Sequence, residues 1–178
     1  ASCRTCHSEA AGPVRGVRTV QLNGPFESAT APGQNEVPAN QLATWEALGL
    51  FEETIGDPAQ YGHLAPIGDE SAPLEDRVRS YWDSNCSACH NDSPGSPSWD
   101  ARYQVPLAEQ KVLMALPLAG AGPDDLRLLY PGEPDRSLIL RRGNSATAGM
   151  RMPPILRNRI DDPYVDVLRR WILTLPEQ

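Results

Sequence analysis

Two copies of one cysteine and histidine pattern contain the residues of this sequence that are best suited to chemistry. Both have the form C-x-x-C-H, and together they use all four cysteines and two of the three histidines: Cys3, Cys6 and His7 in the first copy, and Cys86, Cys89 and His90 in the second. In covalent haem attachment, two thiols at this spacing bond to the porphyrin and the adjacent histidine binds its iron. The pattern therefore predicts two covalently attached haem c groups.

Two other kinds of site also use paired cysteines. A four-cysteine zinc site can be built from two C-x-x-C segments, and one C-x-x-C can form a redox-active dithiol. Neither requires a histidine directly after the second cysteine, whereas both copies here have one. Haem attachment is the favoured interpretation, with zinc and dithiol chemistry as the alternatives.

Haem attachment also predicts a compartment. The thioether bonds form on the outer side of the bacterial inner membrane or in the equivalent organelle space, so we expect an exported protein, periplasmic or extracellular. All four thiols are then used by haem, and we expect no disulfide even though such a compartment permits one.

Charge and hydropathy restrict the partners. The net charge is -7, and only one of the 16 basic residues, Lys111, is a lysine, which leaves no basic stripe for a phosphate backbone. The longest nearly uncharged stretch, residues 112–122, is far shorter than the roughly 20 apolar residues that cross a bilayer. We expect neither a nucleic-acid partner nor a transmembrane segment.

Apolar periodicity predicts a mainly α-helical chain, and its 14 glycines and 18 prolines predict long irregular loops between the helices. One helix begins at Leu74 and runs into Cys86. Another has Asp162 as its N-cap and an apolar stripe that reaches Leu175. Between them, residues 137–142 form a short predicted helix.

The loop Met150-Arg151-Met152-Pro153-Pro154 and the later Leu-Arg-Arg-Trp-Ile segment make residues 69–178 resemble the class I c-type cytochromes. In that family a helix carries C-x-x-C-H, a downstream methionine supplies the sixth iron ligand, and the terminal helices cross through aromatic residues. The resemblance implies a class I-like domain in which Met152 completes the haem of His90. Met150 and a site without a sulfur ligand are the alternatives.

Residues 1–68 form the other predicted haem-binding unit, irregular except for one helix near residues 40–50 that Asn40 can cap. The phrases Val-Arg-Thr-Val-Gln-Leu-Asn (17–23) and Asn-Gln-Leu-Ala-Thr (40–44) resemble a family of dihaem c-type cytochromes. Its members are haem domains found beside larger extracytoplasmic or sugar-dehydrogenase-like modules.

The C-x-x-C-H pattern does not identify the sixth iron ligand of the first haem. His63 is the remaining histidine, and it lies between a glycine and a later proline that suit a ligand loop. Met114 and an open coordination position are the alternatives.

Further residues are candidates for supporting roles. Pro13 and Pro97 could offer carbonyl oxygens to the haem-ligating histidines. Four side chains could bind haem propionates: Trp99, Arg102, Arg142 and Arg151.

These features together predict an electron carrier without a substrate, in which two haems pass single electrons between redox protein partners. An acidic chain attracts a partner with a basic docking face. One alternative is a dihaem peroxidase-like enzyme with an open first haem and an acid-base group over it. The other is a haem-bearing subunit of a filament or larger redox complex, associated with copies of itself or with other proteins.

Overall fold

The computed structural model describes residues 7, 9, 16–26, 39–93, 99–118, 123–155 and 157–176. These residues fall into two compact units. The N-terminal unit is Gly16–Leu64, and the C-terminal unit contains the described residues from Ala65 onward together with His7 and Glu9.

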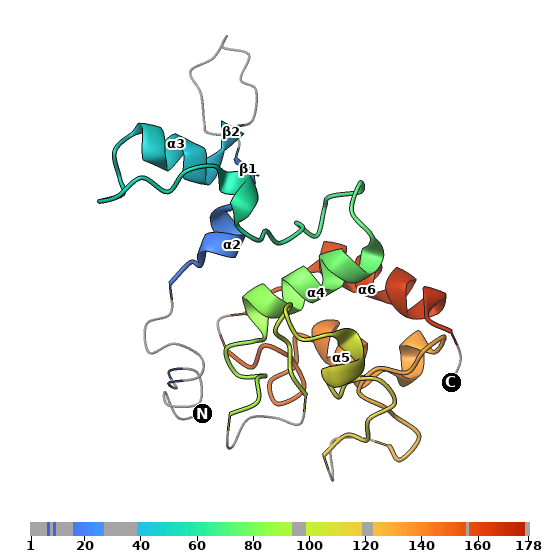
Figure 1. Cartoon of the computed structure of the whole chain (residues 1–178). Helices are drawn as coiled ribbons and strands as arrows, with labels where there is room; N and C mark the ends of the chain where they lie inside the picture. Colours follow the sequence, from blue (N-terminus) through green and yellow to red (C-terminus); the bar gives the residue numbers. More distant parts are fainter. Residues whose placement is uncertain are drawn as a thin grey trace. The chain divides into compact units, whose positions relative to one another are not determined.

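The N-terminal unit is built from short elements. Its strands β1 and β2 pair antiparallel, with Pro25 opposite Asn40. The helix predicted near residues 40–50 is present as α3, and the Asn40 side chain caps it by accepting a hydrogen bond from the Leu42 amide at 2.9 Å. The elements are α2 (Thr19–Leu22), β1 (Pro25–Phe26), β2 (Ala39–Asn40), α3 (Gln41–Ala47) and the 3-10 turn η1 (Pro58–Gln60) (Figure 1).

Asn23 holds the N-terminal unit together. Its side-chain amide donates to the carbonyls of Pro58, Tyr61 and Gly62 at 2.9–3.2 Å. The side-chain carbonyl oxygen of Asn23 accepts a hydrogen bond from the Asn40 side-chain amide at 2.8 Å. Among the described residues of this unit, only Asn23 and Leu42 are fully buried. Hydrogen bonds therefore stabilise this unit to a larger extent than in domains that have a hydrophobic core.

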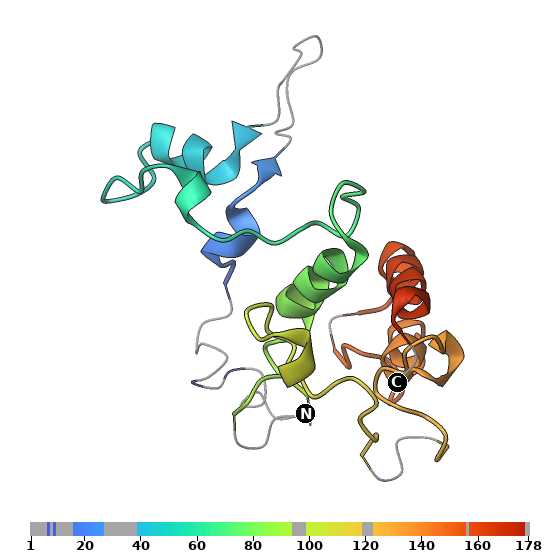
Figure 2. The same cartoon turned by 45° about the vertical axis from the view of Figure 1, so that its right-hand side comes forward.

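The C-terminal unit is organised around two helices. Helices α4 and α6 lie against each other, and in both views most of the chain between them in sequence lies below the pair, whereas the loop before α4 lies above it (Figures 1 and 2). The elements of this unit are α4 (Leu74–Asn85), the 3-10 turns η2 (Leu107–Glu109) and η3 (Pro134–Arg136), α5 (Leu138–Gly143) and α6 (Asp162–Thr174).

Aromatic side chains form the contact between α4 and α6. The Tyr81 and Tyr164 rings stack with their centroids 3.9 Å apart, and Trp82 meets Trp171 edge-on at 5.5 Å. The indole N–H of Trp82 donates to the Tyr164 hydroxyl at 3.0 Å. Trp82 is completely buried, so this bond satisfies a donor that water cannot reach.

Asp161, and not Asp162, caps α6. The Asp161 carboxylate accepts a hydrogen bond from the Tyr164 amide at 3.1 Å, and Asp162 is the first residue of the helix. The prediction of Asp162 as the N-cap is therefore wrong by one position. The reason is geometric, because a capping side chain reaches the amide three residues ahead, and from Asp161 that amide belongs to Tyr164.

Helix α4 also buries a polar face that its apolar stripe does not predict. The Arg77 guanidinium donates twice to the Ile67 carbonyl, at 2.8 and 2.6 Å. The Ser80 hydroxyl accepts from the Ala65 amide at 3.0 Å. These side chains are buried, and their hydrogen-bond partners lie in the loop before α4. Helix α4 therefore holds this loop in place in addition to packing against α6.

No helix in the ranges that the structure describes has the length and apolar character needed to cross a membrane. The longest, α6, has 13 residues, against the roughly 20 that a bilayer requires.

Gly143 lies at a close approach between α5 and α6, which makes it a test of this packing. A Cβ atom at Gly143 would lie 3.0 Å from the Tyr164 ring, and that ring is held between Tyr81 and Trp82. We predict that Gly143→Ala lowers the free energy of unfolding by about 1–2 kcal/mol through overpacking, measured by denaturant titration.

The matched control is Gly68→Ala, because an added Cβ meets no atom within 4 Å there. Its free energy of unfolding should stay within about 0.5 kcal/mol of the native value. A Gly143→Ala protein as stable as the native one would mean that Tyr164 is free to move.

Candidate functional site

The second C-x-x-C-H segment continues directly from α4. The Cys86 amide donates to the Trp82 carbonyl at 2.8 Å, and the His90 amide donates to the Cys86 carbonyl at 2.8 Å. These are bonds between residues four positions apart, as in a helix. The segment therefore makes one further turn, which brings His90 back to the side of the chain where Cys86 lies.

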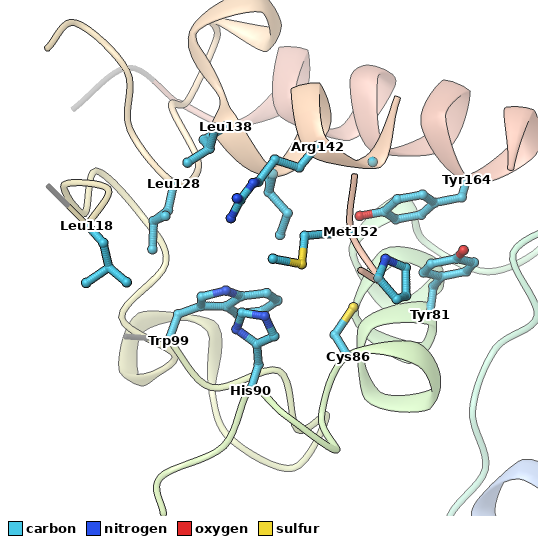
Figure 3. Close-up of a pocket in the computed structure, with 13 residues that line it drawn as sticks. Tyr81, Cys86, His90, Trp99, Leu118, Leu128, Leu138, Arg142, Met152 and Tyr164 are labelled. Atoms are coloured by element: carbon cyan, nitrogen blue, oxygen red, sulfur yellow. The ribbon is translucent and has the colours of Figure 1, made fainter. Parts of the chain in front are cut away.

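Both residues line a cavity of about 190 Å³ in the C-terminal unit. The volume is more than ten times the roughly 10–15 Å³ that holds one water molecule. Figure 3 shows the Cys86 and His90 side chains pointing into this space from the C-x-x-C-H segment and the Met152 side chain pointing into it from another segment. The other lining residues are mostly apolar or aromatic: Tyr81, Trp99, Leu118, Leu128, Leu138, Ile139, Arg142, Gly143, Pro153 and Tyr164.

Trp99 connects the cavity to the hydrophobic core. Its ring lies 4.6 Å from the His90 ring and 5.0 Å from the Trp82 ring, centroid to centroid. Trp82 in turn contacts α6 through Trp171. The position of His90 is thus determined by the same aromatic cluster that joins the two helices.

The remaining apolar wall comes from a loop and from the start of α5, which are joined by backbone hydrogen bonds. The Leu128 amide donates to the Ala115 carbonyl at 2.8 Å, and the Ile139 amide donates to the Leu128 carbonyl at 3.1 Å. Leu128 and Ile139 both line the cavity. These bonds satisfy backbone groups that would otherwise be buried without a partner.

His90 is neutral at physiological pH in this environment. Burial, and secondly the positive charge of Arg142, lower the pKa of His90 to about 4. Its Nδ1 atom is buried and has no hydrogen-bond partner among the described residues. Pro97, the predicted carbonyl partner, lies outside them. A neutral imidazole has a free lone pair, which is the form that binds a metal.

The Cys86 thiol is held in its protonated form. Burial, and then the neighbouring Cys89, raise the pKa of Cys86 to about 12. Reactive C-x-x-C dithiols have pKa shifts in the opposite direction, because the thiolate is the nucleophile. Cys89 is half-buried and does not line the cavity.

The two tyrosines at the cavity are also kept neutral. Burial is the main cause that raises the pKa of Tyr81, and the negative charge of Asp161 adds to it. Burial likewise raises the pKa of Tyr164 well above its ordinary value. The Tyr81 hydroxyl donates to the Asp161 carboxylate at 3.0 Å, so the capping residue of α6 also orients a cavity wall.

Of the three methionines, Met152 alone lines this cavity. Its amide donates to the Arg142 carbonyl at 3.1 Å, which holds the loop against the end of α5. Met150 is 39% exposed. The Met114 amide donates to the Leu129 carbonyl at 2.9 Å in another segment.

The structure separates the four residues predicted to bind propionates. Trp99 and Arg142 line the cavity. The Arg102 guanidinium is paired with Asp100 and, at 2.9 Å, with Asp92. Arg151 donates to the Pro154 carbonyl at 3.4 Å and is not part of the lining. Arg142 and Trp99 are therefore the better candidates.

The first C-x-x-C-H copy lies largely outside the described residues, which exclude Cys3, Cys6 and Pro13. His7 and His63 are both exposed. The backbone around His63 is fixed on both sides, because the Gly62 carbonyl accepts from Asn23 at 3.2 Å and the Leu64 amide donates to the Val20 carbonyl at 3.0 Å. The pairing of His7 with His63 stays a prediction.

Two functional features have no signal in the sequence. Arg157 donates hydrogen bonds to the carbonyls of Met152 and Gly143, and no spacing rule connects these positions. The Asn23 contacts with residues 58–62 likewise join distant segments.

In the described part of the chain, no group of three or more His, Cys, Asp or Glu side chains is arranged to hold a metal ion.

Comparisons with protein-family models, with curated proteins and with solved structures found no match to the chain. The functional interpretation therefore depends on the residues of the site.

Proposed function

We propose that the protein is an exported dihaem c-type cytochrome that transfers single electrons between protein partners. The observation that carries the proposal is that Cys86, His90 and Met152 all line one apolar cavity. The C-x-x-C-H pattern assigns Cys86 to thioether attachment and His90 to iron binding, and the resemblance to class I c-type cytochromes assigns Met152 to iron binding as well.

The cavity has the chemical character that a haem requires. Its walls are largely apolar, which suits a macrocycle. His90 is neutral, which is the form in which a ring nitrogen can bind iron. Its Nδ1 atom has no partner among the described residues, and Pro97, the predicted carbonyl acceptor for it, lies outside them. Arg142 supplies a positive charge at the wall for a propionate.

A covalently bound haem supplies an iron that gains and loses one electron. In the proposed site, the Cys86 and Cys89 thiols would hold the haem covalently, and His90 and Met152 would bind its iron. The apolar walls exclude water and disfavour added charge, and the methionine sulfur favours the ferrous state. The residues thus tune a potential without providing a position for a substrate.

The properties of the site support haem over the two other interpretations. A redox-active dithiol needs a thiol with a lowered pKa, whereas the pKa of Cys86 is raised to about 12. A zinc site needs thiolates and a polar surrounding network, whereas Cys86 faces an apolar cavity.

The first haem is proposed on the first C-x-x-C-H copy. Cys3 and Cys6 would attach it, His7 would be the proximal ligand and His63 the opposite one. The fixed backbone around His63 supports this role, since a ligand loop must hold its side chain in place. Two histidines give a lower potential than histidine with methionine, so electrons would pass from the first haem to the second.

The partners proposed are redox proteins. The chain carries a net charge of -7, and propionates add further negative charge. A partner with a basic docking face would therefore associate faster at low ionic strength. Assembly into a larger complex is compatible with the same chemistry.

Haem content is the direct test of the proposal. We predict two covalently bound haems per chain in protein isolated from a host that attaches haem c. The pyridine haemochrome spectrum and the intact mass should agree on two. Bound zinc, or a mass that shows free thiols, would contradict the proposal.

Met152→Ala tests the second haem. We predict that it abolishes the sulfur-to-iron charge-transfer band. Because axial ligands set haem potentials over roughly 0.8 V, the potential of this haem should fall by on the order of 0.1 V or more. Met150→Ala is the matched control, since Met150 is exposed and does not line the cavity. If the band survives in Met152→Ala and disappears in Met150→Ala, the ligand is Met150.

His63→Ala tests the first haem and separates a carrier from an enzyme. A haem closed by two histidines is low-spin and does not bind added cyanide or carbon monoxide. The substitution should open it to both, while the charge-transfer band of the Met152 haem serves as an internal control. If the native protein already binds these ligands at the first haem, a peroxidase-like function becomes the better interpretation.

A further inference from the structure

Arg157 makes an unusual set of hydrogen bonds. Its two terminal nitrogens donate to the carbonyls of Met152, Gly143 and, at 3.3 Å, Ser145. Its Nε atom donates to the Arg159 carbonyl at 2.9 Å. One guanidinium therefore joins the end of α5 to the loop that carries Met152.

The carbonyls that Arg157 contacts need such a partner. Gly143 is the last residue of α5. The last carbonyls of a helix have no N–H donor within the helix, so they need a partner from elsewhere. The Met152 carbonyl lies outside any helix or strand, so regular secondary structure supplies no donor for it. A planar group with five donors can reach several carbonyls at once.

Burial does little to hold this loop. In the segment 144–150, every residue except Ser145 is exposed. Met152 is instead held at both of its backbone groups, because its amide donates to the Arg142 carbonyl at 3.1 Å and its carbonyl accepts from Arg157. Hydrogen bonds to the end of α5 thus keep Met152 at the cavity.

We propose that Arg157 is the positioning residue that holds Met152 in the cavity wall. This inference rests on the proposed function, in which Met152 is an axial ligand. Without Arg157, the loop would open more often and expose the coordination position to competitors. The apparent affinity of a competing ligand rises in proportion to the open fraction.

The experiment compares Arg157→Gln and Arg157→Lys with the native protein, all isolated with haem attached. The probe is imidazole, which displaces a methionine and is followed by loss of the charge-transfer band. A second measurement, hydrogen-deuterium exchange at the Met152 amide, reports loop opening without depending on iron ligation. For Arg157→Gln we expect at least a tenfold increase in both the apparent imidazole affinity and the exchange rate.

Arg157→Lys should give increases between those of the native protein and Arg157→Gln. Lysine keeps the charge, but its single nitrogen cannot span the three carbonyls. Arg159→Gln is the matched control, since it removes the same charge two positions away from an exposed side chain. Both measurements should stay within twofold of the native values in this control.

The outcomes separate this inference from the proposed function. Unchanged exchange and unchanged imidazole affinity in both Arg157 variants would overturn the positioning role, and if Arg157→Gln does not fold, Arg157→Lys decides in the same way. Faster exchange with unchanged imidazole affinity would support Arg157 as the residue that holds the loop. It would also remove Met152 from the proposed ligand set.

Discussion

The aromatic contact between α4 and α6 is the interaction on which the C-terminal unit depends. Trp82 is completely buried, donates to Tyr164 and contacts both Trp171 and Trp99. Through Trp99 this cluster reaches His90, and the Tyr164 ring lies close to Gly143 at the end of α5. The cavity exists where these contacts leave space among α4, α5, α6 and the loops that carry Trp99, Leu128 and Met152.

Polar side chains hold the irregular segments that regular hydrogen bonding does not reach. Arg79 illustrates this role, because it donates to the Tyr103 and Val105 carbonyls at 2.7 Å. Arg157 does the same for the Met152 loop, and Asn23 for residues 58–62. A chain rich in glycine and proline has many backbone groups outside helices and strands, and each buried one needs a partner.

The two units therefore differ in what stabilises them. The C-terminal unit has a continuous core of aromatic and aliphatic side chains. The N-terminal unit, by contrast, has Leu42 and Asn23 as the only buried residues among those described. A segment of this size buries too little apolar surface to be stable by packing alone.

The sequence by itself determined the helices with an apolar stripe, the Asn40 cap and the two C-x-x-C-H segments, because local spacing and local capping decide these features. It also singled out Met152 from three methionines, through a resemblance and not through geometry. Only the tertiary structure decided that Asp161 caps α6 and that Met152 and His90 line one cavity. The same is true of the bond between Arg157 and the Met152 carbonyl. A contact between a side chain and a distant carbonyl does not recur at a fixed spacing along the chain, so it cannot be predicted from a sequence pattern.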